Sequence, residues 1–268
     1  MLKGNDIHFA YQRERDVLNG ISFSLNKGDT LAIVGASGCG KSTLLRILSG
    51  ILSNSNGNSL QGEITIDGLN PDQYRQTGKL AFMFQEATLM PHLSVRQNIE
   101  LPLKIKNIDN SQKVNELLRT VGLEDYADYL PKQLSGGMKT RVALARSFAT
   151  NPELLLLDEP FSSLDISWKS KLYIELEKLK EQNNTTVVIV THDVQEALLL
   201  ANHVIVLNTF GAIELKKEIH SAYGIMERVK NISGYMNSIY EDYMLLIQDA
   251  IINGQSRKYE KQSSLHIA

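Results

Sequence analysis

Gly35-Ala36-Ser37-Gly38-Cys39-Gly40-Lys41-Ser42-Thr43 is the sequence from which the rest of the chain is best interpreted. The apolar run Leu31 to Val34 precedes it, and Leu44 to Leu48, with helical spacing, follows it. A strand, a glycine-rich loop and a helix in this order are the setting in which the pattern G-x-x-x-x-G-K-[ST] binds phosphate. The alternative is a glycine-rich turn that contains Gly-Lys-Ser by chance, and these flanks make it the weaker interpretation.

The residue types in this loop suit a nucleotide. Glycines lack a Cβ, so the backbone can curl tightly and direct several N–H groups at one point. The N-terminus of the following helix adds the positive end of its dipole there. Lys41 supplies a full charge for the β- and γ-phosphates, and the Ser42 hydroxyl is a hard oxygen ligand for Mg²⁺. We therefore expect residues 35–43 to bind a nucleoside triphosphate.

Composition limits the class of protein. The chain has 268 residues, a formal net charge of −2 and 43% hydrophobic residues, which suffices for one core with an appended subdomain. The near-neutral charge gives no reason to expect a nucleic-acid partner. No apolar run approaches the roughly 18 residues of a membrane span, and the N-terminus lacks the apolar segment of a signal peptide. With a single cysteine besides, these features predict a soluble, intracellular protein.

Two kinds of strand are predicted. Alternating apolar and polar residues over 7–11, 21–25 and 63–66 indicate half-buried antiparallel strands. Short, nearly continuous apolar runs indicate a parallel sheet covered on both faces, and they lie at 31–34, 80–84, 154–157, 187–190 and 204–207. Residues from about 88 to 150 have a helical pattern, as an insertion between two core strands would.

Two further segments carry candidate chemistry. A buried strand ends in Asp158-Glu159-Pro160, at the carboxyl end where open α/β sheets bind ligands. Asp158 is suited to hold the Mg²⁺ that Ser42 touches, and Glu159 to accept a proton from an attacking water. Leu134-Ser135-Gly136-Gly137-Met138 offers a hydroxyl, two glycine amides and a second helix N-terminus. Taken alone, an ordinary turn and an ordinary serine N-cap are the alternatives for these two segments.

Six motifs in fixed order resemble the ATP-binding subunits of ABC transporters, over about residues 5–210. The Walker A loop corresponds to Gly35 to Thr43, and the Q-loop glutamine to Gln85. The family signature corresponds to Leu134 to Met138, and Walker B with its glutamate to Leu154 to Glu159. The D-loop corresponds to Ser163 to Asp165, and the switch histidine to His192. Tyr11 stands where the family places an aromatic ring that stacks on adenine, with Phe9 close by.

The resemblance implies an α/β fold of the P-loop NTPase class. Its RecA-like, mostly parallel sheet would carry an N-terminal antiparallel β subdomain and an inserted helical subdomain at about 88–150. The ATP-binding domain would span residues 1–215. Residues 216–268 would form a C-terminal, mostly helical extension with a frayed end.

The resemblance also implies the site residues. Glu159, Lys41, His192 and Gln85 would be catalytic, and Ser42, Gln85 and Asp158 would hold Mg²⁺. The residues that contact ATP would be Tyr11, Gly35, Ala36, Ser37, Gly38, Cys39, Gly40, Lys41, Ser42, Thr43, Gln85, Ser135, Gly136, Gly137 and Asp165. Two copies would sandwich two ATP molecules, so that Walker A of one copy faces the signature of the other.

Met138 replaces the usual glutamine of the signature, and Thr140 departs from many relatives just before Arg141. A signature ending in methionine resembles importers of nitrate, sulfonates and taurine, and also lipid-transport ATPases. We therefore expect an importer of oxyanions or organosulfonates. The alternatives are a lipid-transport ABC ATPase, a soluble ABC ATPase without a transport role, and a P-loop kinase or GTPase, although the last would not need the signature.

The implied partners are a second copy of the chain, integral membrane permease subunits and a substrate-binding protein, with no nucleic acid. The implied location is the cytoplasm, peripheral on the inner face of the cell membrane. Ala87, Leu89, Met90 and Leu93 are candidates for the permease surface, with packing inside the helical subdomain as the alternative.

The C-terminal part shows a narrow apolar stripe with heptad-like spacing, formed by Ile225, Val229, Ile232, Met236, Ile239, Tyr243, Leu246 and Ala250. Such a seam needs one partner surface. Either it packs on its own ATPase domain or it pairs with a twin or a membrane subunit; the first is favoured, because most amphipathic helices pack within their own chain.

Overall fold

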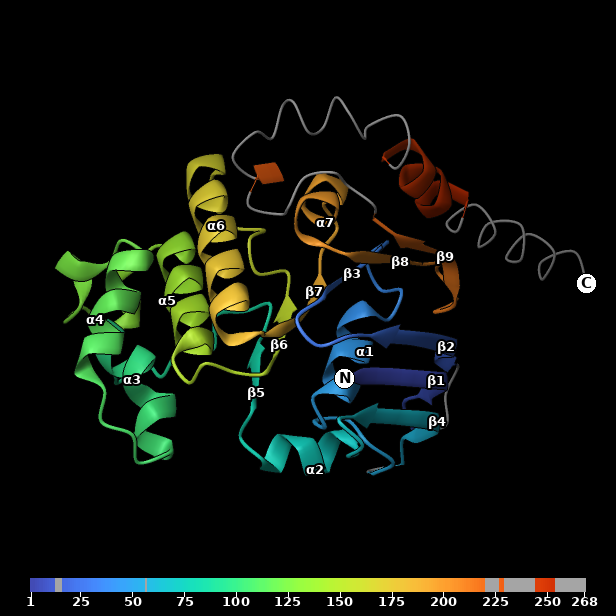
Figure 1. Ribbon diagram of the computed structural model, residues 1–268, viewed down its shortest axis with the longest axis horizontal. Coiled ribbons are helices and arrows are strands. Elements are labelled where there is room, and N and C mark those ends of the chain that lie inside the picture. The colour runs from blue at the N-terminus through green and yellow to red at the C-terminus, as the bar shows by residue number, and fades with distance from the viewer. Residues whose placement is uncertain (13–15, 56, 220–226, 229–243, 254–268) are drawn as a thin grey trace, which may run out of the picture.

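The computed structural model describes residues 1–12, 16–55, 57–219, 227–228 and 244–253 (Figure 1). A six-stranded sheet with the order β5-β6-β7-β3-β8-β9 forms its centre, and a separate three-stranded sheet has the order β2-β1-β4. Helices α3, α4 and α5 lie at the opposite end of the molecule from the three-stranded sheet (Figure 1).

The central sheet confirms the predicted parallel strands. They are β3 (Thr30–Gly35), β5 (Leu80–Met83), β6 (Leu154–Asp158), β7 (Thr186–Val190) and β8 (His203–Leu207), and the pairings among these five strands are all parallel. The sixth strand, β9 (Ile213–Glu218), is antiparallel to β8 and was not predicted. It continues past residue 215, where the sequence analysis placed the end of the ATP-binding domain.

The central sheet separates two apolar cores, which explains why its strands are continuously apolar. Ala32 and Val34 face a core shared with helices α3 to α7, whereas Leu31 and Ile33 face a core shared with α1 and the three-stranded sheet. Every residue of β3, β6 and β7 is buried. Burying both faces requires an apolar side chain at each position rather than at every second one.

The three-stranded sheet comprises β1 (Leu2–Ala10), β2 (Asp16–Leu25) and β4 (Ser59–Ile66), and both of its pairings are antiparallel. Each strand extends beyond its predicted limits because residues such as Leu2 and Leu18 also face the core. The alternating pattern therefore identified the strands correctly but shortened them.

Seven α-helices lie between the strands in the described part of the chain up to residue 219. They are α1 (Lys41–Leu48), α2 (Pro71–Gln76), α3 (Val95–Ile105), α4 (Ser111–Thr120), α5 (Gly136–Phe148), α6 (Ile166–Asn183) and α7 (Val194–Leu200), with 3-10 turns η1 (Glu124–Tyr126) and η2 (Pro131–Gln133). Ser94, Ser135 and Asp165 cap α3, α5 and α6 by accepting hydrogen bonds from backbone N–H groups. No helix among the described residues has the length and apolar character needed to cross a membrane.

Part of the C-terminal region packs on the domain. Residues 244–253 are helical, and Met244 and Ile247 are buried in the core that faces α3 to α7. Arg228, a charged residue that is not a member of the apolar stripe, is 4% exposed and donates hydrogen bonds to the carbonyls of Leu198 and Ala201 at the end of α7.

The predicted stripe is out of register where it is described. Leu246 was placed on it but is 42% exposed, and the buried face runs through Met244 and Ile247 instead. Ala250 is partly buried against the same core. The other members of the stripe, and the frayed end predicted from Ser256, lie outside the described residues.

Candidate functional site

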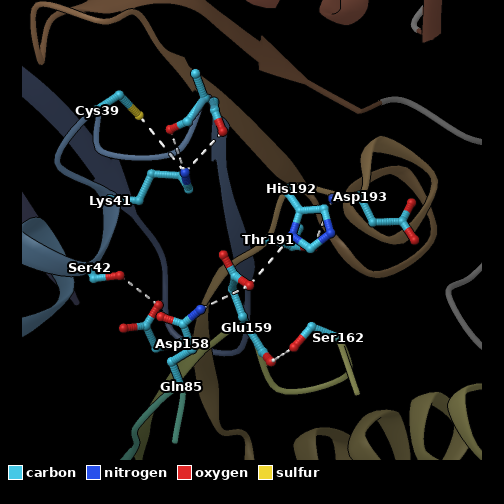
Figure 2. Close-up of polar contacts among 12 residues, drawn as sticks. Cys39, Lys41, Ser42, Gln85, Asp158, Glu159, Ser162, Thr191, His192 and Asp193 are labelled. Carbon is cyan, nitrogen blue, oxygen red and sulfur yellow. Dashed lines mark hydrogen bonds and ion pairs between the residues drawn. The ribbon is translucent and has the colours of Figure 1, made fainter. Parts of the chain in front are cut away.

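The carboxyl ends of β3, β6 and β7 meet the loop that precedes α1, and the candidate residues gather there (Figure 2). The loop of residues 35–43 is called the phosphate-binding loop below. A cavity of about 240 Å³ opens beside it, lined by Val17, Ser37, Gly38, Gly40, Lys41, Ser42, Thr43, Gln85 and Glu159. The structure therefore brings together residues far apart in the chain that the sequence analysis assigned to one site.

Two glycines give the phosphate-binding loop its shape. Gly40 has a φ of 100°, and a Cβ added there would lie 2.8 Å from the carbonyl oxygen of Val17. A Cβ on Gly35 would lie 2.5 Å from the carbonyl oxygen of Leu207. No side chain fits at either position, so the loop keeps the tight curl in which backbone N–H groups can surround a phosphate.

The Lys41 side chain folds back across its own loop. Its ammonium donates hydrogen bonds to the carbonyl oxygens of Gly35 at 2.9 Å and Ala36 at 2.8 Å, and its Nζ lies 3.9 Å from Cys39 Sγ (Figure 2). Lys41 is only 6% exposed. A full positive charge is thus held beside the loop, at the wall of the cavity, where a phosphate would need a counter-charge.

Ser42 and Asp158 form the pair best suited to a metal ion. The Ser42 hydroxyl donates to Asp158 Oδ1 at 2.9 Å, and Asp158 is 1% exposed. Burial raises the pKa of Asp158, and the hydrogen bond from Ser42 opposes this rise. Hydroxyl and carboxylate oxygens are the donors that Mg²⁺ prefers.

The described residues contain no group of three or more His, Cys, Asp or Glu side chains that would enclose a metal. A Mg²⁺ at Ser42 and Asp158 would therefore take its remaining oxygens from phosphate and water, as this ion commonly does. The residues fit Mg²⁺ in that open arrangement.

Glu159 lies between two polar side chains. Its Oε2 is 3.3 Å from Gln85 Nε2 and 3.4 Å from His192 Nδ1 (Figure 2). Its φ is 48°, a left-handed conformation that few residues other than glycine adopt. A backbone hydrogen bond to the carbonyl of Val190 at 2.9 Å holds this turn, and Ser162 Oγ donates to the Glu159 carbonyl at 3.1 Å. The carboxylate is thereby directed into the cavity.

Tyr11 lies just past β1, beside the phosphate-binding loop. Its hydroxyl is 3.3 Å from Thr43 Oγ1, and its ring meets the Phe9 ring edge-on with centroids 4.9 Å apart. Phe9 is fully buried, whereas Tyr11 is partly exposed. Of the two rings, Tyr11 is the one that a nucleobase can reach.

A second group of predicted residues lies elsewhere. Residues 134–138, the signature segment, and residues 163–165, the D-loop, are not among the residues that line the cavity. Ser135 caps α5 and Asp165 caps α6, and both are exposed. Hydrogen bonds from the Ser167 hydroxyl and the Trp168 N–H lower the pKa of Asp165. Within one chain, the structure does not join the signature segment to the phosphate-binding loop.

Sequence analysis missed two residues of the site. Val17 lines the cavity from β2, and Ser162 fixes the backbone of Glu159. Val17 carried no signal, because only the packing of the three-stranded sheet brings it to the loop. Ser162 carried a weak one, since it follows Glu159 within a turn.

Comparisons with known proteins agree with this geometry. The family model described as ABC transporter matches residues 18–162. The aliphatic sulfonates import ATP-binding protein SsuB of Bacillus cereus is 42% identical over 192 residues, which is 72% of this chain and 74% of that protein. The spermidine/putrescine import ATP-binding protein PotA of Thermotoga maritima is 40% identical over 195 residues, 72% of this chain and 52% of that protein.

Solved structures extend the similarity to three dimensions. A dimeric ATP-binding cassette in a post-hydrolysis state, bound to ADP and Pi, matches with a TM-score of 0.74 and 31% identity, covering 82% of this chain and 100% of the other. A dimeric bacterial ABC transporter cassette matches with the same TM-score and 32% identity, again over 82% of this chain and 100% of the other.

Proposed function

Because the chain belongs to the ABC transporter family of ATP-binding proteins, we propose that it is the ATP-hydrolysing subunit of an import system. The observation that carries the proposal is the convergence of Lys41, the Ser42–Asp158 pair and Glu159 on one cavity. The residue roles below are part of the proposal.

ATP binds with its phosphates in the loop of residues 35–43. The loop N–H groups and the N-terminus of α1 bind the phosphate oxygens, and the Lys41 ammonium balances the charge of the β- and γ-phosphates. Tyr11 contacts the base. Mg²⁺, when bound by Ser42 and Asp158, neutralises charge that develops on the phosphates.

Glu159 is the general base. A water in line with the γ-phosphate attacks the γ-phosphorus while the bond from phosphorus to the bridging oxygen breaks and ADP leaves, and the Glu159 carboxylate accepts the proton of that water. Gln85 and His192, which lie on either side of this carboxylate, orient the water and contact the γ-phosphate. The amide oxygen of Gln85 would be a further ligand of Mg²⁺.

The second half of each site comes from another copy of the chain. Ser135, Gly136 and Gly137 are a phosphate-binding arrangement remote from the chain's own loop, and the solved relatives are dimeric. Two copies that stack head to tail place each signature segment on the ATP of the partner. Hydrolysis is then gated by closure of the dimer.

We further propose that membrane permease subunits dock beside Gln85. This docking holds the protein peripherally at the cytoplasmic face of the cell membrane. Ala87 and Leu89 pack against the main core, whereas Met90 is 40% exposed. Of the four candidate residues for this surface, Met90 is therefore the exposed one. Residues 1–215 form the ATP-binding domain in this proposal, and residues 88–150 its helical subdomain.

Organosulfonates or related oxyanions are the proposed cargo, delivered by a substrate-binding protein. The support is the 42% identity to a sulfonate import protein together with Met138 in the signature segment. A relative at 40% identity is named as a spermidine/putrescine import protein. The test must therefore offer both a sulfonate and a polyamine. ATPase activity in vesicles with the permease should rise with an alkanesulfonate-loaded binding protein and not with spermidine; the opposite response would overturn the cargo alone.

A mixed dimer tests the trans arrangement. Ser135→Arg blocks the signature segment, and Lys41→Ala disables the phosphate-binding loop. In a dimer of one chain of each kind, both lesions fall in one composite site and the other site is intact. The mixture should pair with ATP more tightly than either variant alone, and equal pairing would refute the head-to-tail dimer.

A further inference from the structure

Two hydroxyl groups join the signature helix to the D-loop. Thr140, in the first turns of α5, is 8% exposed, and its Oγ1 lies 2.8 Å from Ser163 Oγ and 3.2 Å from the carbonyl oxygen of Gly136. A threonine hydroxyl has one proton. Thr140 therefore donates to Gly136 and accepts from Ser163, so a chain of two hydrogen bonds runs from the D-loop to a signature glycine.

The backbone is equally close at this contact. A Cβ added to Gly137 would lie 3.4 Å from the carbonyl oxygen of Ser163 and 3.6 Å from Leu164 Cδ2. A single methyl group on Gly137 would thus be in van der Waals contact with the D-loop, so little room separates it from the signature segment. The hydroxyl bridge and this packing fix the distance between the two.

A second contact, from the residue next to Thr140, joins α5 to α6. The Arg141 guanidinium lies 3.9 Å from the centroid of the Trp168 ring and donates to the Val121 carbonyl at 2.6 Å. A Cβ on Gly122 would lie 2.2 Å from the far edge of the same ring. Trp168 is therefore wedged between a cation and a glycine turn, a geometry in which cation–π attraction is effective.

We propose that Thr140, Ser163 and Trp168 are positioning residues, which hold the signature segment and Asp165 in one fixed register. The chain then presents both segments as a unit to the ATP bound by a second copy. This inference rests on the proposed head-to-tail dimer. Among the three residues, none lines the nucleotide cavity of its own chain, so they act through Ser135 to Gly137 and Asp165.

Placement within a mixed dimer tests the proposal. One chain carries Lys41→Ala and binds ATP weakly through its own loop, so the single working site combines the loop of the other chain with the signature segment of this one. Thr140→Val, which keeps the shape and removes the hydroxyl, is placed in either chain. The ATP concentration for half-maximal association is measured by pull-down with two affinity tags.

In the Lys41→Ala chain, Thr140→Val should raise this concentration about two- to tenfold, the effect of one hydrogen bond. In the other chain it should have no effect, because that signature segment faces the disabled loop. Thr140→Ser should restore the value. Ser163→Ala, at an exposed residue where folding is not at risk, should match Thr140→Val, and the two together should do no more than one.

The outcomes separate the possible failures. Equal effects of Thr140→Val in both chains would mean a merely structural role and would overturn the inference. The inference would also be overturned if Ser163→Ala left the ATP concentration for half-maximal association unchanged. Ser135→Arg in the same placements is the reference. If Ser135→Arg depends on placement and Thr140→Val does not, only this inference fails; if Ser135→Arg shows no dependence, the proposed dimer fails and the inference with it.

Discussion

The phosphate-binding loop and the signature segment, which both contact ATP in the proposed function, differ in how far their side chains are buried within the chain. In the first, Lys41 and Asp158 are almost completely buried and bonded to the chain's own groups. In the second, Ser135 and Gly136 are exposed, and Thr140 and Arg141, which contact the D-loop and α6, follow them in α5.

This difference in burial matches the two proposed functions, in which the phosphate-binding loop binds the chain's own ATP and the signature segment contacts the ATP of a second copy. A buried charge is costly without compensation, and hydrogen bonds within the chain to Lys41 and Asp158 offset part of that cost. The signature side exposes neutral hydroxyl and amide groups, which need no partner when the chain is alone. Substitutions on the loop side should affect the chain's own ATP, and those on the signature side the ATP of the other copy. The predictions below run from the largest expected effect on turnover to the smallest.

Glu159→Gln should abolish most hydrolysis while ATP binding persists. The amide keeps the shape of the side chain but cannot accept the proton of the water, and loss of a general base lowers the rate on the order of 10²–10⁴-fold. Hydrolysis and ATP binding are measured on the same purified dimer. An active Glu159→Gln protein would indicate that the general base comes from the signature side, which would contradict the division of roles between the two segments.

Lys41→Ala should lower turnover on the order of 10²–10³-fold, as removal of one preorganised charged contact does. It should also weaken ATP binding, measured by titration with a fluorescent analogue. Lys27→Ala is the matched control, because Lys27 forms an ion pair with Glu153 at the surface, where such pairs contribute little. Similar losses in both variants would contradict the role of Lys41.

Asp158→Asn should lower Mg²⁺-dependent turnover about ten- to a hundredfold and yet stabilise the nucleotide-free chain. Because burial raises the pKa of Asp158, its ionised form destabilises the fold at neutral pH. The Tm of Asp158→Asn should therefore exceed that of the wild type at pH 7. As the pH falls through the raised pKa, the wild-type carboxyl takes up a proton and the difference in Tm should shrink. A difference that grows on acidification would show that the buried charge is compensated.

Ile247→Ala should leave turnover per folded molecule unchanged, since the residue belongs to neither half-site. It should lower stability by about 2–5 kcal/mol, because Ile247 is fully buried. Leu246→Ala, at the neighbouring residue that is 42% exposed, is the control and should barely alter Tm. Loss of association without ATP, at an unchanged Tm, would instead support a role of the C-terminal helix in pairing.

Local patterns predicted much of this molecule. The strand, loop and helix around residues 35–43 form within a few turns of chain, so their motif sufficed. The parallel strands were recognisable because both faces of β3, β6 and β7 are buried. The strand β9 was missed, although Ile213 and Leu215 alternate with charged residues, because the change of character near residue 216 was interpreted as the start of a helix.

Contacts between segments that are distant in the chain could not be predicted from the sequence. Nothing in the chain shows that Thr140 meets Ser163, although Thr140 stood out as a departure from relatives. The burial of Arg228 was equally hidden, because a charged residue off an apolar stripe normally faces solvent, and only the carbonyls at the end of α7 make its burial acceptable. The predicted register of the C-terminal helix was wrong because the apolar stripe was drawn through Tyr243 and Leu246, whereas the buried face runs through Met244 and Ile247.

The position of Cys39 has a practical consequence for labelling. It is the only cysteine in the sequence, it is 2% exposed, and burial raises the pKa of its thiol. The thiolate is the species that reacts with maleimides, so the folded wild-type chain should resist them. A cysteine introduced at Ile166, which is 82% exposed next to the D-loop, should then take up a fluorophore alone. The approach of a second copy can thus be followed optically with the native phosphate-binding loop intact.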